Sequence, residues 1–324
     1  MSVAPRVRQP RRALHGVLLL DKPLGWTSND ALQKCKGLLR AEKGGHTGTL
    51  DPLATGLLPL CFGAATKFAQ ASLDADKRYR ATLRLGQRTT TGDREGEVVE
   101  QRQVAVDRLA IERACASLTG TIDQRPPMHS ALKHEGKALY EYARAGIEID
   151  RPARRVTIHR IDIVSWQAED LVIDVHCSKG TYIRTLAEDI GERLGCGAHL
   201  AALRRTGSGK LDVSQAMTME QLQALDEPAR AALLRPADVL VAEWPAVRLP
   251  DDEAGRFLSG LRRRVALADA PAVRVYASTP PPLAAGLPDP RAFLGSAHIH
   301  GGELIADRLL SPLEVQAVLQ ASHA

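Results

Sequence analysis

Hydrophobic and polar positions follow two periods along the chain, and these predict a body built from strands and helices. Apolar runs and two-residue alternation predict strands, whereas apolar residues three to four positions apart predict amphipathic helices. The expected strands span residues 16–20, 57–60, 79–86, 155–164 and 171–177, and the expected helices span residues 29–39, 64–73, 107–118 and 138–145, with another that ends at Leu194. Ser28 directly precedes the first helix and is expected to cap it. The pattern therefore predicts an α/β (α+β) body.

The pattern changes at about Pro245, where long periodic segments give way to short ones. The expected strands here span residues 247–249, 265–267, 273–276, 292–297 and 304–306, and Pro/Gly turns separate them. Short strands at close spacing with such turns are typical of a compact β module. The Pro-rich stretch at residues 279–290 is expected to be a flexible insertion in that module.

Length and charge narrow the class of protein. A chain of 324 residues has room for about two domains. Its net charge of +5 and its pI near 9.0 favour a polyanionic partner such as nucleic acid. Four arginines (Arg6, Arg8, Arg11 and Arg12) form a basic tail, which we expect to be disordered and which could contact a polyanion. A merely solvated tail would have the same composition.

No run approaches ~20 apolar residues, and the N-terminus has no secretory signal, so a soluble intracellular protein is expected. The five cysteines are scattered and include no CxxC pair. This usage predicts a reducing compartment and argues against a disulfide framework and a zinc site. The histidines also lack ligand spacing with carboxylates or thiols, so no metal site is expected.

The stretch at residues 44–56 is the strongest candidate for chemistry. It is dense in glycine and threonine and precedes the apolar run at residues 57–62. Such a loop suits a tight backbone path that presents one carboxylate, that of Asp51, to a ligand. Asp51 could instead cap a helix beginning at Pro52. A phosphate-binding loop is less favoured because the stretch has no GK[ST] pattern.

Other polar and aromatic residues could work with Asp51. Arg184 would favour its charged form, although Arg184 could equally pair with Glu188 one helical turn on. Tyr79 and Tyr182 offer flat faces for stacking a base, but a tyrosine in such a position can also belong to the core. The residues around His46 indicate an ordinary loop histidine rather than a ligand.

Residues 124–146 differ in character from the segments around them. They mix basic, apolar and aromatic residues without a clean period and end in the helical stretch. The segment could be an excursion that reaches a partner, or an ordinary surface loop.

Several motifs in a fixed order resemble one known family. They are Leu18-Leu19-Leu20-Asp21-Lys22-Pro23, the block from Gly45 to Gly56 around Asp51, Asp76-Lys77-Arg78-Tyr79, Ser178-Lys179-Gly180-Thr181-Tyr182-Ile183-Arg184, and Leu203-Arg204-Arg205. Together they resemble the bacterial tRNA pseudouridine-55 synthases of the TruB type. The resemblance runs from about Gly16 to Arg205. Beyond it, only the terminal β module, which looks like a PUA-type RNA-binding domain, adds support.

The resemblance implies a fold and a domain plan. The fold is the pseudouridine synthase catalytic fold around a mixed, largely antiparallel sheet, followed by a small β-barrel PUA-like module. The implied division is a tail at residues 1–13, a catalytic domain at 14–244 and the RNA-binding module at 245–324. Residues 124–146 correspond to a thumb that grips RNA and whose Lys and Arg side chains contact phosphates.

The resemblance also implies a cofactor-free, metal-free isomerisation. A uridine in the tRNA T loop is flipped out, its N1–C1′ bond breaks, the uracil turns, and C5 joins C1′. Asp51 is the implied nucleophile or base, and its target atom (C6, C1′ or the C2′ proton) stays open. Arg184 would orient Asp51, and Tyr79 would stack on the uracil and could remove the C5 proton.

The remaining implied site residues shape the pocket. Tyr182 and Leu203 would line it, Lys22 and Pro23 would buttress it, and His46 would fill the space that the flipped nucleoside leaves in the RNA.

The implied partner is the tRNA T-arm, with no membrane and no obligatory protein partner. A cytoplasmic monomer is expected. Two alternatives stay open at this stage: an RNA-binding or tRNA-folding protein, and a related synthase that acts on another RNA or with guide RNA.

Overall fold

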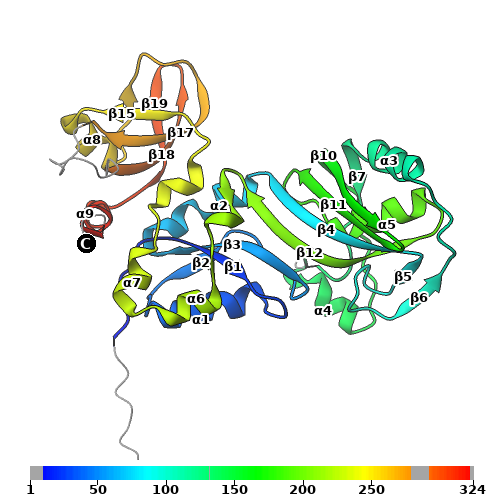
Figure 1. The fold of residues 1–324 in the computed structure, drawn as a ribbon. Helices are drawn as coiled ribbons and strands as arrows, with labels where there is room; N and C mark the ends of the chain where they lie inside the picture. Colours follow the sequence, from blue (N-terminus) through cyan, green and yellow to red (C-terminus); the bar gives the residue numbers. More distant parts are fainter. Residues whose placement is uncertain (1–9, 131, 279–291, 322–324) are drawn as a thin grey trace, which may run out of the picture.

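A ten-stranded sheet forms the centre of the larger lobe in the computed structural model, which describes residues 10–130, 132–278 and 292–321 (Figure 1). Its main path runs β14 (Met217–Thr218), β1 (Gly16–Lys22), β3 (Ala54–Phe62), β12 (Ala198–Ser208), β4 (Lys77–Leu85), β11 (Asp170–Cys177), β10 (Arg154–Gln167) and β7 (Gly120–Gln124), with β2 (Gly44–His46) beside β3 and β13 (Leu211–Asp212) beside β12. Only β1–β14 and β3–β12 pair in parallel. The predicted mixed, largely antiparallel sheet is confirmed.

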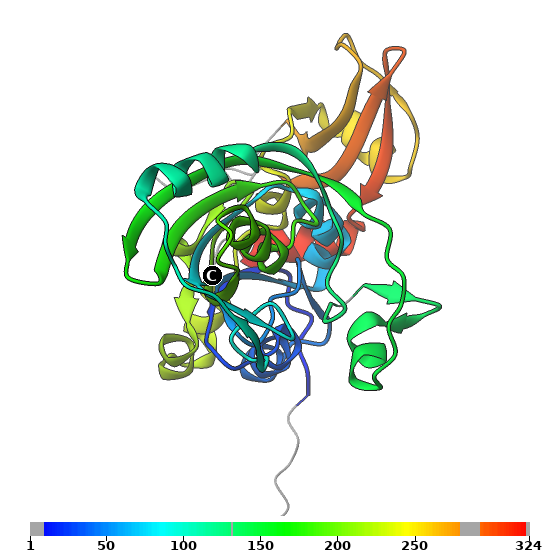
Figure 2. The same cartoon turned by 90° about the vertical axis from the view of Figure 1, so that its right-hand side faces the viewer.

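Helices cover the sheet on both faces. They are α1 (Ser28–Leu38), α2 (Ala69–Asp74), α3 (Arg108–Ser117), α5 (Ile183–Arg193), α6 (Met219–Ala224) and α7 (Glu227–Ala232), with 3₁₀ turns η1 (Gly63–Phe68), η2 (Val213–Gln215) and η3 (Ala237–Val241), whereas α4 (Leu139–Arg144) lies apart from the sheet. In Figure 2 the sheet curls around α5. The single helix predicted at residues 64–73 is instead the 3₁₀ turn η1 followed by the short helix α2.

Alternating positions on β1 divide the interior. Val17 and Leu19 join the core that contains η1 and η3, whereas Leu18 and Leu20 join the core that contains α1 and α6. Because both faces of this part of the sheet are covered, β3 is a nearly continuous apolar run rather than an alternating one. A third core lies between β4, β10, β11, β12 and the helices α3 and α5.

A five-stranded sheet forms the smaller lobe. Its order is β15 (Ala246–Leu249), β17 (Ala270–Ala277), β18 (Phe293–His300), β19 (Glu303–Leu309) and β16 (Arg263–Arg264), with α8 (Asp251–Leu258) and α9 (Pro312–Ala321) beside it. Tyr276 and Phe293 pack into the same core as Val17, and the Tyr276 hydroxyl donates a 2.6 Å hydrogen bond to Asp238. The two lobes are thus joined through a shared apolar core.

The segment predicted as an excursion leaves the sheet at the end of β7. It forms a small hairpin from β8 (Lys133–His134) and β9 (Lys137–Ala138), followed by α4, and this unit projects from the body in Figure 2. A second small hairpin pairs β5 (Gln87–Thr89) with β6 (Val98–Gln101).

Two local predictions were wrong. Thr27, not Ser28, caps α1, because its side chain accepts from the Asp30 amide while Asp30 accepts from the Thr27 amide. Residues 265–267 do not form the predicted strand, and the strand next to them is the two-residue β16 (Arg263–Arg264). Leu267 is exposed, so that stretch lacks the alternating buried positions of a strand.

Two segments that were predicted to be flexible lie partly or wholly outside the described residues. Arg12 donates its amide to the Arg40 carbonyl at 2.7 Å and pairs with Glu227 at 2.5 Å. Residues 1–9 of the predicted tail, and residues 279–290 of the predicted insertion, lie outside the described residues.

Gly56 is required where β3 meets β12. Its φ is +99°, a conformation that non-glycine residues rarely adopt, and a Cβ at this position would overlap the backbone of Arg205. Arg205 is the register partner of Gly56 on β12. Backbone approach at this glycine therefore permits the parallel pairing that connects the two halves of the large sheet.

We expect Gly56→Ala to lower the free energy of unfolding by about 3 kcal/mol or more, since positive-φ strain and backbone overlap add together. Gly45→Ala is the matched control, because Gly45 belongs to the same motif yet a Cβ there meets nothing within 4 Å. Urea unfolding followed by circular dichroism measures both. Equal stability of the two variants would contradict the close approach at Gly56.

Candidate active site at the Asp51 loop

The loop that carries Asp51 is fixed by backbone and hydroxyl hydrogen bonds. Ser28 Oγ accepts from the Leu50 amide at 2.8 Å and donates to the Leu50 carbonyl at 3.2 Å, and the Gly25 amide donates to Pro52 O at 2.8 Å. The buried Ser28 therefore holds the loop rather than capping α1. No helix begins at Pro52, because a turn there leads directly into β3, so the helix-cap alternative for Asp51 is wrong.

Arg184 lies in the first turn of α5 and reaches Asp51. Its Nη2 lies 3.1 Å from Asp51 Oδ2, and its Nη1 lies 3.4 Å from Asp93 Oδ2. Nη2 also donates to the His129 carbonyl at 2.5 Å. Among the described residues, the ion pairs of Arg184 are with these two carboxylates, so the alternative pairing with Glu188 is wrong.

Burial differs sharply across this triad. The side chain of Arg184 is 7% exposed and that of Asp93 is 5% exposed, whereas that of Asp51 is 44% exposed. Asp93 and Arg184 therefore form a buried support, and Asp51 presents its carboxylate to solvent. The arrangement combines a fixed cation with an accessible carboxylate.

Sequence reasoning missed Asp93, which lies in the turn between β5 and β6. Its Oδ1 accepts from Thr91 Oγ1 at 2.6 Å and from the Glu95 amide at 3.1 Å, which leaves Oδ2 for Arg184. An aspartate that closes a turn in this way is common, so its local pattern carried no sign of the distant arginine.

Asp51 opens into a cavity of about 340 Å³ at the junction of the Asp51 loop, β4, β12, the N-terminus of α5 and the thumb-like segment. The lining side chains that could contact a ligand are those of Thr49, Asp51, Lys77, Tyr79, Ser130, Leu132, Tyr182, Ile183, Arg184, Leu203 and Arg205. A cavity of this size, in which charged and hydroxyl groups converge beside leucine, isoleucine and tyrosine side chains, suits a small polar ligand with an apolar or aromatic face.

The structure brings Tyr79, Tyr182 and Leu203 to this cavity with Asp51 and Arg184. Burial raises the pKa of the Tyr79 phenol, and the nearby Arg205 guanidinium acts in the opposite direction. Burial also raises the pKa of Tyr182, and the nearby Ser130 hydroxyl acts in the opposite direction. Both phenols are therefore protonated at neutral pH.

Arg205 is a further lining residue that sequence reasoning did not assign a role. Its side chain is fully buried, its Nε donates to the Leu57 carbonyl at 2.7 Å, and it faces Tyr79 across β12 and β4. Burial lowers the pKa of Arg205, while Tyr79 raises it. The Arg205 cation therefore offsets part of the effect of burial on the Tyr79 phenol.

Lys22 and His46 stand behind the cavity rather than in its lining. Lys22 is 0% exposed, and its ammonium donates to Pro23 O at 2.9 Å and Trp26 O at 2.6 Å. Burial lowers its pKa to about 8, although Asp51 opposes the shift. This position suits a buttress and not direct substrate contact. Burial and Arg205 lower the pKa of His46, so its imidazole is neutral at pH 7.

Two family models match the chain in sequence. The TruB family pseudouridylate synthase N-terminal domain matches residues 36–183, and the tRNA pseudouridylate synthase B C-terminal domain matches residues 184–242. Among full-length relatives, the tRNA pseudouridine synthase B of Verminephrobacter eiseniae is 56% identical over 98% of this chain and 96% of its own length. That of Cupriavidus pinatubonensis is 56% identical over 94% of this chain and 96% of its own length.

Solved structures support the fold. A Cbf5-Nop10-Gar1 complex contains a chain with a TM-score of 0.70 and 24% identity that covers 97% of this chain and 93% of that one. A chain of an H/ACA RNP bound to a substrate RNA containing 2′-deoxyuridine gives a TM-score of 0.69 and 22% identity, over 93% of this chain and 86% of that one. At this identity the likeness concerns the fold alone.

These findings confirm the expected enzyme class, an isomerase that forms pseudouridine, and the expected catalytic fold. The curled five-stranded sheet is consistent with the expected PUA-like module. Two family models together span residues 36–242, and relatives of the same name match nearly the whole length, so the chain belongs to the TruB family of pseudouridylate synthases.

Proposed function

We propose that this chain converts uridine 55 in the T loop of tRNA to pseudouridine, with Asp51 as the residue that attacks the nucleoside. The observation that carries the proposal is the ion pair between Asp51 and Arg184 at the floor of an open cavity. A cation fixed in advance beside the reacting carboxylate requires no reorganisation during the reaction. The Asp51 carboxylate is also exposed enough to reach a ligand.

In the reaction that we propose, the cavity receives the flipped uridine and then retains the detached uracil. The stacked uridine flips out at a cost of about a few kcal/mol and enters between Tyr79, Tyr182 and Leu203. Asp51 acts on the nucleoside, the N1–C1′ bond breaks, and the walls hold the free uracil while it turns. C5 then joins C1′, and the C5 proton must leave.

Tyr79 is the proposed acceptor of that proton. Its phenol is protonated at rest, so in this scheme it first gives its own proton to N1 of the detached uracil, and the resulting phenolate then takes the proton from C5. Arg205 lies in the register position opposite Tyr79 and would stabilise the phenolate. Tyr79 therefore combines stacking on the uracil with the final proton transfer.

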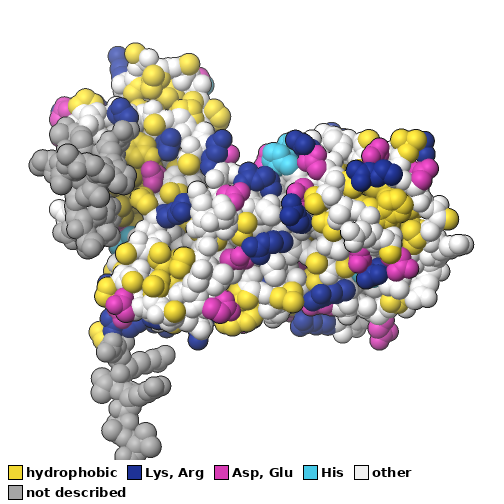
Figure 3. Space-filling view, viewed as in Figure 1, with side chains coloured by type: hydrophobic (Ala, Val, Ile, Leu, Met, Phe, Trp, Pro, Cys, Tyr) yellow, Lys and Arg dark blue, Asp and Glu magenta, His cyan; other side chains and the backbone are white. Residues whose placement is uncertain are grey.

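The RNA would lie across the outer surface around this cavity. Lys and Arg side chains recur along the face shown in Figure 3, from the smaller lobe across the middle of the larger one, with acidic side chains between them. The thumb-like segment borders the cavity through Ser130 and Leu132. We propose that residues 124–146 grip the T-arm, that residues 14–244 form the catalytic domain, and that residues 245–324 bind RNA.

The proposal extends to how the protein works in the cell. It acts as a cytoplasmic monomer on tRNA without an obligatory protein partner, and His46 fills the space vacated in the RNA. No helix among the described residues is long and apolar enough to cross a membrane.

Asp51→Asn should abolish pseudouridine formation on a tRNA transcript and leave binding within a few-fold of wild type. Arg184 keeps its contacts with Asp93 and the His129 carbonyl, so the fold should survive. Nuclease digestion with mass spectrometry of chemically tagged pseudouridine measures the product, and filter binding measures affinity. Asp174→Asn, which breaks an exposed ion pair with Arg80, is the control with expected full activity. Turnover by Asp51→Asn would disprove the proposed role.

The same assays test substrate choice. T-arm minihelices should be modified by the protein alone, and other stem-loops should not. Wild-type protein that refolds tRNA without producing pseudouridine would instead favour a folding protein.

Tyr79→Phe should keep tRNA binding but slow the final proton transfer by about 10²-fold or more, because the ring can still stack while the hydroxyl is gone. Release of tritium from tRNA that carries [5-³H]uridine measures this step in a single turnover. A rate equal to that of wild type would show that another group, or water, takes the C5 proton.

Asp93→Asn should lower the single-turnover rate by about 10-fold to 100-fold, because a buried arginine loses its buried charge partner and Asp51 loses a fixed neighbour. The amide oxygen can still accept from Thr91 and the Glu95 amide, so the loss of stability should be only about 1–3 kcal/mol. The control is Asp212→Asn, which breaks an ion pair with Arg78 away from the cavity. An unchanged rate would separate Asp93 from the chemistry.

A further inference from the structure

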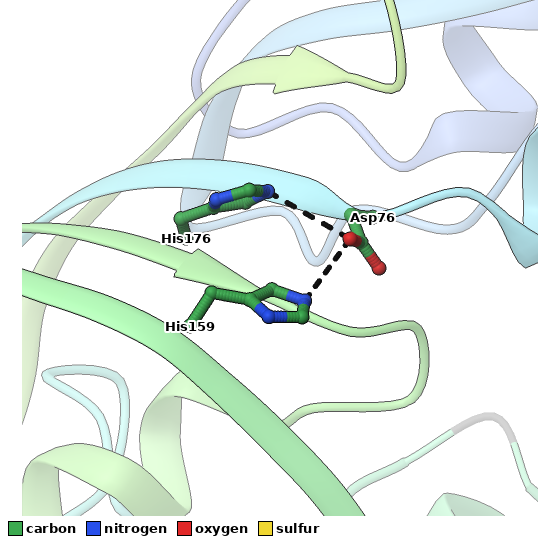
Figure 4. Close-up of side chains that lie close together, drawn as sticks. All are labelled: Asp76, His159 and His176. Atoms are coloured by element: carbon green, nitrogen blue, oxygen red, sulfur yellow. Dashed lines mark ion pairs between the residues drawn. The ribbon is translucent and has the colours of Figure 1, made fainter. Parts of the chain in front are cut away.

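A cluster of two imidazoles and one carboxylate lies outside the Asp51 cavity. Asp76 directly precedes β4, His159 lies on β10 and His176 lies on β11. Figure 4 shows both rings directed toward the Asp76 carboxylate. None of these residues lines the cavity of Asp51.

A bulge in β10 brings the second imidazole into the cluster. The register pairs Ile158 with Cys177 and Arg160 with His176, so His159 is an extra residue between the two pairs. An extra residue in one strand redirects its side chain and often marks a functional position. Here the centroid of the His159 ring lies 4.7 Å from the centroid of the His176 ring.

The separations of the ligand atoms suit a small tetrahedral metal ion. Nε2 of His159 lies 3.0 Å and Nε2 of His176 lies 3.8 Å from Asp76 Oδ2, and the three ligand atoms lie within 4.8 Å of one another. Bonds of 2.0–2.1 Å at tetrahedral angles place ligand atoms about 3.3 Å apart. Both measured separations from the carboxylate oxygen are within about 0.5 Å of that value.

From these contacts we propose that Asp76, His159 and His176 form a binding site for one Zn²⁺ ion. Two imidazoles and a carboxylate are a ligand set that zinc accepts, and a fourth position stays open to water. The three side chains are between 37% and 45% exposed, so an ion can enter from solvent. It would replace the contact between the carboxylate and the imidazoles that the apo cluster makes.

The surroundings do not oppose a cation. Arg78, a charged neighbour of His176, is paired with Asp212, and Glu243 adds negative charge near His176. The spacing of these residues along the sequence predicted no metal site, because three separate strands supply them.

Bound zinc would connect three strands of the large sheet. It would link β10 and β11 to the start of β4, three positions before Tyr79. A ligand that binds only the folded state raises its stability. We therefore expect zinc to raise the melting temperature.

The test is isothermal titration of ZnCl₂ into the full-length, untagged, metal-free protein, with a thermal melt in the presence and absence of zinc. We expect one saturable site per chain and a rise in melting temperature in wild type. His159→Gln and His176→Gln should each lose both. All three ligand side chains lie near the surface, so these variants should fold, which circular dichroism would confirm.

His298→Gln is the matched control, because His298 pairs with Asp307 at 2.9 Å as a single imidazole beside a carboxylate. It should bind zinc as wild type does. The five cysteines are buried and offer no competing surface site. Failure of wild type to bind zinc, or equal binding by His176→Gln, would overturn the proposal, and neither result would affect the proposed role of Asp51.

Discussion

The buried guanidinium of Arg184 is the group on which the site depends. A charge that is 7% exposed must be compensated, and Asp93, the His129 carbonyl and Asp51 provide the compensation from three separate segments. Asp93 is buried, whereas Asp51 is accessible. The requirement to pair a buried cation therefore also fixes the position of a carboxylate at the edge of a cavity.

The sheet brings these segments together. Gly56 allows β3 to approach β12, and this pairing places Leu203, Arg204 and Arg205 beside the strand that follows the Asp51 loop. On its other side β12 pairs with β4, which places Tyr79 opposite Arg205. One central strand thus connects the carboxylate loop to the aromatic wall, and the hydrogen bonds between Ser28 Oγ and the backbone of Leu50 hold that loop in place.

Three buried cations lie near the Asp51 carboxylate or the cavity beside it. Arg184 pairs with Asp51, Arg205 borders the cavity, and the effect of Asp51 on the pKa of Lys22 places a third cation within its field. Burial lowers the pKa of both Lys22 and Arg205. The charged forms of these two side chains are therefore less stable here than they would be in water. Strained electrostatics of this kind are typical of functional sites rather than of structural cores.

The sequence by itself determined the elements and the candidate residues. Periodicity located β1, β4, β10, β11, α1 and α3, and the ordered motifs pointed to Asp51, Tyr79, Tyr182, Arg184 and Leu203, all of which lie at one cavity. These signals are local, because strand alternation and motif spacing depend only on neighbours along the chain. Only the tertiary structure decided which charges meet. Asp93 had the pattern of an ordinary turn, Ser28 that of a helix cap, and the Asp76 cluster no pattern at all, because each acquires its role from a residue on another strand or loop.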